Sequence, residues 1–198
     1  MAAFAGCSFI LLGRAVGAGP DPAWMLTIES SWVNHGSLAA WWFTWLGYAF
    51  VLIPAALALL IVAWRLPQWR SRAIFSIVML VTCWQAADAF QHFFARPRRL
   101  DWVVRHETAW SYPSSHAAIA VGFYLLWSIF IFRSTLPRKR IWSAILAAAA
   151  AAILWSRLAL AAHYLTDVVG GALLAAAIVA LAAAVVPINV FGVTARRP

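Results

Sequence analysis

The feature that most constrains this chain is a succession of long apolar stretches separated by short basic clusters. Hydrophobic residues make up 65% of its 198 residues and charged residues only 11%, which is far more apolar than a soluble globular domain. A helix needs about 20 mostly apolar residues to cross a bilayer, and several of these stretches reach that length. The sequence therefore predicts an all-α fold, an integral membrane helical bundle with no room for a sizeable soluble domain.

Five crossings are expected after residue 37. The stretches that supply them are Leu38–Trp64 with a kink at Pro54, Ala73–Phe94, Ala117–Phe132 with a start as early as Ser114, and Ile141–Val186. The last stretch is too long for one crossing, so it is expected to form two helices with the Arg157–His163 region between them.

The first 37 residues are less regular. Residues 3–18 are apolar but short, and form either a first membrane helix or an interfacial anchor; residues 23–37 are typical of an interfacial amphipathic segment. We therefore expect five or six transmembrane helices in a single domain, 1–198. Residues 1–37 would supply the short helix and interfacial segment, and residues 38–187 the catalytic helical core.

The charged residues predict how the chain is oriented. The net charge is +9, and the basic residues that fall after alternate crossings are Arg65, Arg70, Arg72, Arg133, Arg138, Lys139, Arg140, Arg196 and Arg197. The positive-inside rule places these residues on the cytoplasmic side. The acidic residues and all five histidines then lie on the opposite face. Such short clusters between apolar spans indicate membrane topology and not a nucleic-acid partner.

The most informative polar stretch runs from Ser156 to Asp167. His163 and Asp167 are four residues apart, so on a helix they share one face, where a carboxylate can orient an imidazole and raise its basicity. Arg157 adds a forked cation that suits phosphate oxygens. Polar groups inside apolar membrane segments tend to mark functional sites. The structural alternative is a surface-facing histidine beside an aspartate N-cap.

Two further polar stretches belong to the same predicted face, Gln91–Arg99 and Tyr112–His116. Together the three stretches match the needs of a phosphate: arginines that bind oxygens in a bidentate manner, serine N–H groups at a helix start, and two histidines for attack and proton transfer. No paired carboxylates or cysteine cluster predict a metal site.

These residues resemble the motifs of the type 2 phosphatidic acid phosphatase family, which is related to vanadium haloperoxidases and glucose-6-phosphatase. The family motifs are Lys-x6-Arg-Pro, Pro-Ser-Gly-His and Ser-Arg-x5-His-x3-Asp. The third is complete here, the second has Ser115 in place of Gly, and the first keeps Arg98 but has Gln91 for Lys and Arg99 for Pro. The resemblance covers about residues 38–187.

The resemblance implies three catalytic residues. His163 would be the nucleophile that forms a phosphohistidine, Asp167 would orient it, and His116 would protonate the leaving group and then activate water. The phosphate-binding residues would be Arg98, Arg157, Ser114, Ser115 and Gln91. No cofactor and no metal are expected.

The expected function is metal-independent hydrolysis of a lipid phosphate at the outer, periplasmic face of a bacterial inner membrane. Candidate substrates are undecaprenyl pyrophosphate, phosphatidylglycerophosphate, phosphatidic acid and lipid A. The partners are then the lipid substrate and the bilayer, while the oligomeric state is left open. Two alternatives remain: a lipid phosphotransferase that uses the same residues, and a non-catalytic channel or transporter that uses the polar cluster as an ion path.

Overall fold

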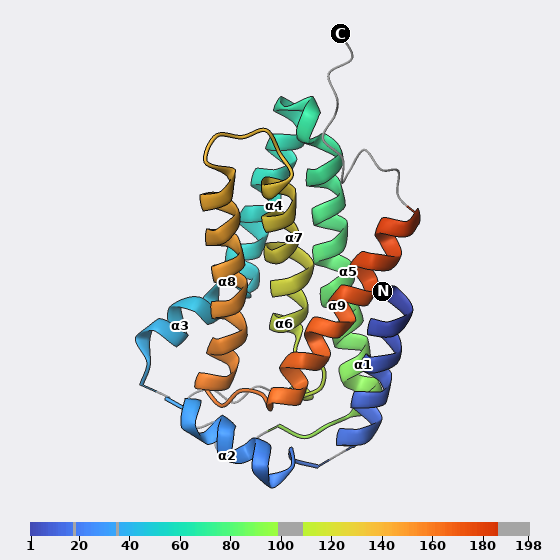
Figure 1. The fold of residues 1–198 in the computed structure, drawn as a ribbon, viewed down its shortest axis with the longest axis vertical. Coiled ribbons are helices and arrows are strands. Elements are labelled where there is room, and N and C mark those ends of the chain that lie inside the picture. Colours follow the sequence, from blue (N-terminus) through green and yellow to red (C-terminus); the bar gives the residue numbers. More distant parts are fainter. Residues whose placement is uncertain (18, 35, 99–108, 186–198) are drawn as a thin grey trace.

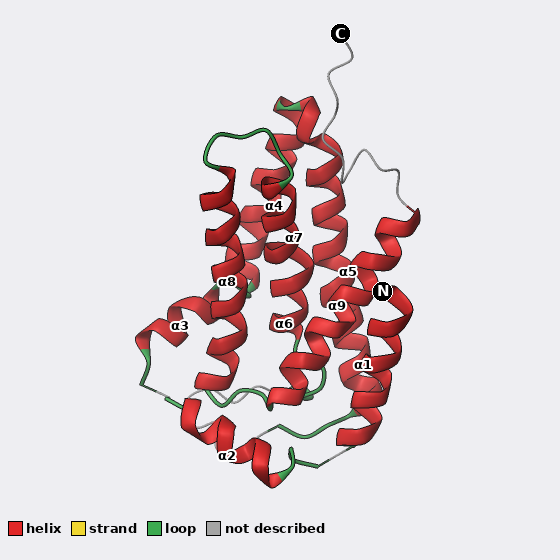
Figure 2. Ribbon diagram, in the orientation of Figure 1, coloured by secondary structure: helices red, strands yellow, loops and turns green. Residues whose placement is uncertain are grey.

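The computed structural model describes residues 1–198 except 18, 35, 99–108 and 186–198. All regular secondary structure in the described part is helical (Figure 2), which confirms the all-α prediction. The elements are α1 (Ala2–Val16), α2 (Ala23–Trp32), α3 (Leu38–Trp45), α4 (Ala49–Arg65), η1 (Pro67–Trp69), α5 (Arg70–Phe94), α6 (Ser115–Ile119), the π-helical η2 (Ala120–Leu125), α7 (Leu126–Phe132), α8 (Lys139–Ala159) and α9 (Leu165–Val185).

Four helical segments of the described residues are long and apolar enough to cross a membrane, namely Pro67–Phe94, Ser115–Phe132, Lys139–Ala159 and Leu165–Val185. The pair α3 and α4 makes a fifth if it is counted as one bent span. The apolar helix α1 is shorter, with 15 residues. This inventory agrees with the predicted membrane bundle of five or six helices, in which α1 would be the sixth.

The first predicted span differs from the expectation in where it bends. The sequence predicts one helix kinked at Pro54, but the chain breaks at residues 46–48, where α3 and α4 meet at 44°, and Pro54 lies inside α4. We attribute the position of the break to close packing at Gly47. A Cβ atom on Gly47 would lie 2.3 Å from Cδ2 of His116, so only glycine lets the chain pass this close to α6.

The helices place two kinds of loop at opposite ends of the bundle (Figure 1). One end, called the site end here, carries α2, the chain that follows α5 at residues 95–98, and the connection between α8 and α9 at residues 160–164. The other end, called the basic end, carries η1 and the loop between α7 and α8. The polar chemistry and the described basic clusters are therefore separated along the bundle, as the charge pattern predicted; Arg196 and Arg197 lie outside the described residues.

The N-terminal helix is part of the packed bundle. Helix α1 packs along α9, and the buried ring of Phe9 stacks on Tyr112 with ring centroids 5.6 Å apart. The Tyr112 hydroxyl donates a hydrogen bond of 2.7 Å to the carbonyl of Phe9. These contacts fix the chain just before α6, so α1 supports one wall of the polar site.

Candidate active site

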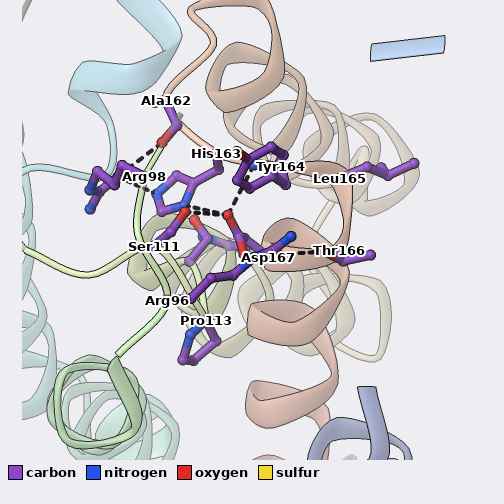
Figure 3. Close-up of polar contacts among 12 residues, drawn as sticks. Arg96, Arg98, Ser111, Pro113, Ala162, His163, Tyr164, Leu165, Thr166 and Asp167 are labelled. Carbon is purple, nitrogen blue, oxygen red and sulfur yellow. Dashed lines mark hydrogen bonds and ion pairs between the residues drawn. The ribbon is translucent and has the colours of Figure 1, made fainter. Parts of the chain in front are cut away.

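His163 lies in the connection between α8 and α9, and Asp167 lies in the first turn of α9 (Figure 3). The spacing predicted that the two residues share one face of a helix. This is wrong, because α9 begins only at Leu165 and His163 lies before it. Asp167 instead accepts the N–H of Tyr164 at 2.9 Å and so closes the start of α9. His163 is only 1% exposed and its Nδ1 is 3.4 Å from Oδ2 of Asp167. The pair is therefore buried at a loop–helix junction, unlike a surface-facing histidine.

The Asp167 carboxylate is held by donors from three parts of the chain (Figure 3). Its Oδ1 accepts from Nη1 of Arg96 at 2.6 Å. Its Oδ2 accepts from the Ser111 hydroxyl and from the Tyr164 N–H. Because all of these groups are buried or nearly so, the carboxylate has one fixed orientation, with Oδ2 toward His163.

The other side of the imidazole faces an arginine. Nη1 of Arg98 is 3.2 Å from Nε2 of His163 and 3.0 Å from the carbonyl of Ala162. Its Nε donates to the carbonyl of Ala109 at 2.7 Å. Arg98 is therefore the arginine of the stretch after α5 that the structure places against the histidine.

Burial and the nearby Arg98 lower the pKa of His163 from 6.5 to about 4, although Asp167 acts in the opposite direction. The imidazole is thus neutral at ordinary pH. With an N–H donor on the Arg98 side and a carboxylate on the other, the tautomer that fits has its hydrogen on Nδ1 and its lone pair on Nε2.

The start of α6 is held against the start of α9. Ser114 is the N-cap of α6, and its N–H donates to the Asp167 carbonyl at 3.0 Å. Gly171 allows this approach, since a Cβ there would lie 2.3 Å from the Ser114 carbonyl oxygen. Ser115 and His116 occupy the first turn of α6. The structure therefore brings the second and third sequence motifs together at the site end.

The α3–α4 break supports two more of the predicted residues. His116 is 7% exposed, and its ring meets Tyr48 edge-on at 4.8 Å between centroids. Arg157, in the last turn of α8, is 1% exposed, and its Nη1 donates to the Thr44 hydroxyl at 2.6 Å. Arg157 is also close enough for its charge to contribute to the lowered pKa of His163. One bent segment thus positions both a histidine and an arginine.

Gln91 occupies a different kind of position. Its side chain is 3% exposed, and Nε2 donates to the Pro113 carbonyl at 2.8 Å. The amide therefore supports the chain before α6, while its contact with phosphate stays a prediction. Arg99, at the family proline position, lies outside the described residues.

Four polar residues of the site were not assigned to it by the sequence: Asp21, Thr44, Arg96 and Ser111. Arg96 belongs to none of the three motifs, yet it is 0% exposed and binds Asp167. Asp21 follows a Gly-Pro break and was assigned only to the outer face, yet it is 2% exposed and pairs with Arg96. The sequence signal that could have identified Arg96 and Ser111 as site residues is their position, since each lies two residues before a motif residue.

An apolar helical bundle with a buried His–Asp pair and arginines at one end defines a membrane-embedded protein with a site for an anionic group. A sequence model of the PAP2 superfamily matches residues 75–191, more than half of the chain, and the chain belongs to this superfamily. The family resemblance predicted from the motifs is thereby confirmed, and with it the prediction of a phosphatase.

The fold is also found in a solved structure, described as the crystal structure of the first transmembrane PAP2 type phosphatidylglycerolphosphate phosphatase from Bacillus subtilis. The TM-score is 0.71 at 18% sequence identity, and the match covers 93% of this chain and 97% of that one. This similarity shows that the two chains share a fold. A comparison with curated proteins gave no match.

Proposed function

We propose that this protein hydrolyses a phosphomonoester or pyrophosphate lipid through a phosphohistidine on His163. The observation that carries the proposal is the environment of the imidazole. It is buried, its lowered pKa keeps it neutral, Nδ1 faces Asp167 at 3.4 Å, and Nε2 faces Arg98 at 3.2 Å. A histidine in this state has the lone pair that attack on phosphorus requires.

In the first step, Nε2 of His163 attacks phosphorus and the bond from phosphorus to the leaving oxygen breaks. His116, in its protonated form, gives a proton to that oxygen, so that the lipid alcohol or lipid phosphate leaves neutralised. The phosphorylated imidazole gains a positive charge, which the adjacent Asp167 carboxylate stabilises.

In the second step, neutral His116 takes a proton from water while the water oxygen attacks the phosphohistidine. The N–P bond breaks, inorganic phosphate leaves, and both histidines return to their starting states. His116 thus acts first as an acid and then as a base. Its place in the first turn of α6, next to the Ser114–Asp167 backbone contact, supports this pairing with His163.

The transferred phosphoryl group would be bound by Arg98, Arg157 and the Ser115 N–H, because the Ser114 N–H already donates to the Asp167 carbonyl. Both guanidinium groups are fixed by hydrogen bonds, Arg98 to backbone carbonyls and Arg157 to Thr44. Fixed donors stabilise charge that develops on equatorial oxygens without reorganisation. Ser115 in place of the family glycine adds a hydroxyl donor at the same helix start.

The charge pattern supports one side of the membrane for the site, and the structural neighbour supports one substrate to test first. The basic end carries Arg65, Arg70 and Arg72 and, on the other side of it, Arg138, Lys139 and Arg140. By the positive-inside rule, this supports a periplasmic position for the site end in a bacterial inner membrane. Because the structural neighbour is described as a phosphatidylglycerolphosphate phosphatase, phosphatidylglycerophosphate is the first substrate to test. Phosphatidic acid and undecaprenyl pyrophosphate are the next.

The experiment is phosphate release by the purified full-length protein from this panel of lipids, including lipid A, with EDTA present and His163→Ala as the control. The described residues contain no group of three or more His, Cys, Asp or Glu side chains that could hold a metal ion, and EDTA tests the expected metal independence directly. Release in EDTA that depends on His163 supports the proposal. Phosphate that appears on an acceptor lipid would favour the phosphotransferase, and release by His163→Ala would contradict the mechanism.

A further inference from the structure

A buried charge network joins the N-terminal segment to the catalytic pair. Arg96 is 0% exposed and Asp21 is 2% exposed. Nη2 of Arg96 is 2.7 Å from Oδ1 of Asp21, and Nη1 of the same guanidinium is 2.6 Å from Oδ1 of Asp167. One arginine is therefore shared between two buried carboxylates, and only one of these touches the proposed nucleophile.

The remaining contacts fix Asp21 beside the start of α9. Its Oδ2 accepts the N–H of Thr166 at 3.1 Å, and its Oδ1 accepts the Thr166 hydroxyl. Glu29, in α2, accepts the N–H of Leu165 at 2.9 Å. Two acidic residues from the first 37 therefore satisfy successive N–H groups at the start of the helix that carries Asp167.

Arg96 is equally constrained. Its Nε donates to the Gly19 carbonyl at 3.0 Å, its Nη1 also donates to the Thr166 hydroxyl at 2.7 Å, and its guanidinium lies 4.3 Å from the centre of the Tyr164 ring. A buried arginine this closely bound cannot move to follow a change in charge nearby. The charge balance must therefore come from the fixed carboxylates around it.

The net charge around Asp167 depends on whether Asp21 carries its negative charge. With it, the cluster of Asp21, Arg96 and Asp167 has a net charge of about −1. The phosphoryl group brings about two negative charges, which the Arg98 and Arg157 guanidinium groups match, so the positive charge gained by the His163 ring makes the cluster neutral overall. Without the Asp21 charge, the cluster is neutral at rest, and phosphorylation would leave an uncompensated positive charge in a buried site, which is unfavourable.

We propose that Asp21 is a positioning residue for catalysis, which acts through Arg96 to leave the charge of Asp167 available to the phosphorylated His163. The N-terminal segment is then a working part of the active site, although it precedes residue 75, where the superfamily match begins. This inference rests on the proposed function.

The test is Asp21→Asn in the full-length protein, which removes the charge and keeps an oxygen to accept the Thr166 N–H. We expect kcat to fall about 10- to 100-fold while KM changes less than about twofold, because the arginines that bind phosphate are unaltered. Rapid-quench measurement with a labelled lipid phosphate should show slower formation of the phosphoenzyme. Glu29→Gln is the matched control: it removes a carboxylate that is equally buried and accepts the preceding N–H of α9, and kcat should stay within about threefold.

Asp21→Glu separates charge from structure. It keeps the charge but overfills the site, so it should lower the melting temperature while retaining more of kcat than Asp21→Asn. If Asp21→Asn does not fold, Asp21→Glu decides: a folded variant with near wild-type kcat supports the proposal, and a loss of tenfold or more overturns it. Wild-type kcat in a folded Asp21→Asn also overturns it. Failure of the proposed function looks different, because wild-type protein would then release no phosphate or His163→Ala would still release it.

Discussion

Replacing Asp167 by Asn tests most directly whether the carboxylate beside His163 drives phosphoryl transfer. The side chain keeps its size and one acceptor oxygen, so Ser111 or Arg96 can still donate to it. Arg96 also keeps its ion pair with Asp21 at 2.7 Å, so its buried charge is not left alone. We therefore expect the variant to insert and fold, with a lower melting temperature than the wild type.

The size of the catalytic loss follows from the distance between charges. At an effective dielectric constant of about 20, unit charges at the 3.4 Å that separates Nδ1 of His163 from Oδ2 of Asp167 attract by about 5 kcal/mol. At about 1.4 kcal/mol for each factor of ten, this corresponds to roughly a 10³- to 10⁴-fold loss in kcat. An amide N–H directed at Nδ1 would also favour the wrong tautomer, with the hydrogen on Nε2.

The assay is phosphate release under saturating lipid phosphate in detergent, with folding checked by size-exclusion chromatography and thermal melting. Ser111→Ala is the matched control, because it removes a neutral donor to the same Oδ2 atom but leaves the charge in place. Its kcat should fall about tenfold or less. If Asp167→Asn keeps more than a tenth of wild-type kcat while His163→Ala is inactive, the carboxylate does not stabilise the phosphohistidine in the way proposed.

Three other predictions concern groups around the site. Burial and Arg98 hold the pKa of His163 at about 4 in the folded protein, compared with 6.5 in the unfolded chain, so the unfolded chain binds the extra proton at higher pH. The melting temperature should therefore fall as the pH drops from 6.5 to 4. In His163→Gln, the contribution of His163 to this fall should be absent. Gly47→Ala should lower kcat at least tenfold, because the added methyl meets the His116 ring; unchanged kcat in a folded variant would contradict close packing there. Thr44→Val removes the hydroxyl group that accepts a hydrogen bond from Arg157, so KM, measured from initial rates, should rise several-fold. An unchanged KM would show that Arg157 is positioned without this hydroxyl group.

The relation between sequence and structure differs from one element to the next. The spans from Ala73 to Phe94 and from Ser114 to Phe132 could be predicted because hydrophobic length is a local property. The division of the last apolar stretch at Arg157–His163 could also be predicted, since one crossing cannot hold so many residues. The position of the bend near residue 47 could not be predicted, because Gly47 packs there against the ring of His116, which lies far along the chain.

The same distinction holds within the candidate site. The motif residues His163, Asp167 and His116 could be identified because their spacing is fixed within short stretches. His163 lies in the α8–α9 connection and not on a helix because α9 begins after it. Asp21 and Glu29, which accept N–H groups at the start of α9, help to set this beginning from more than 130 residues away in the sequence. Side chains this distant leave no periodic signal in a sequence.

By itself, the sequence determined the membrane bundle, the separation of basic clusters from polar chemistry, and the family motifs, because each depends on composition or on spacing within a few residues. Only the tertiary structure decided which arginine faces which group: Arg98 lies against His163, and Arg96, two residues earlier, is buried between Asp21 and Asp167. The physical reason is that a buried charge is stable only with partners, and folding, not local order, brings those partners together.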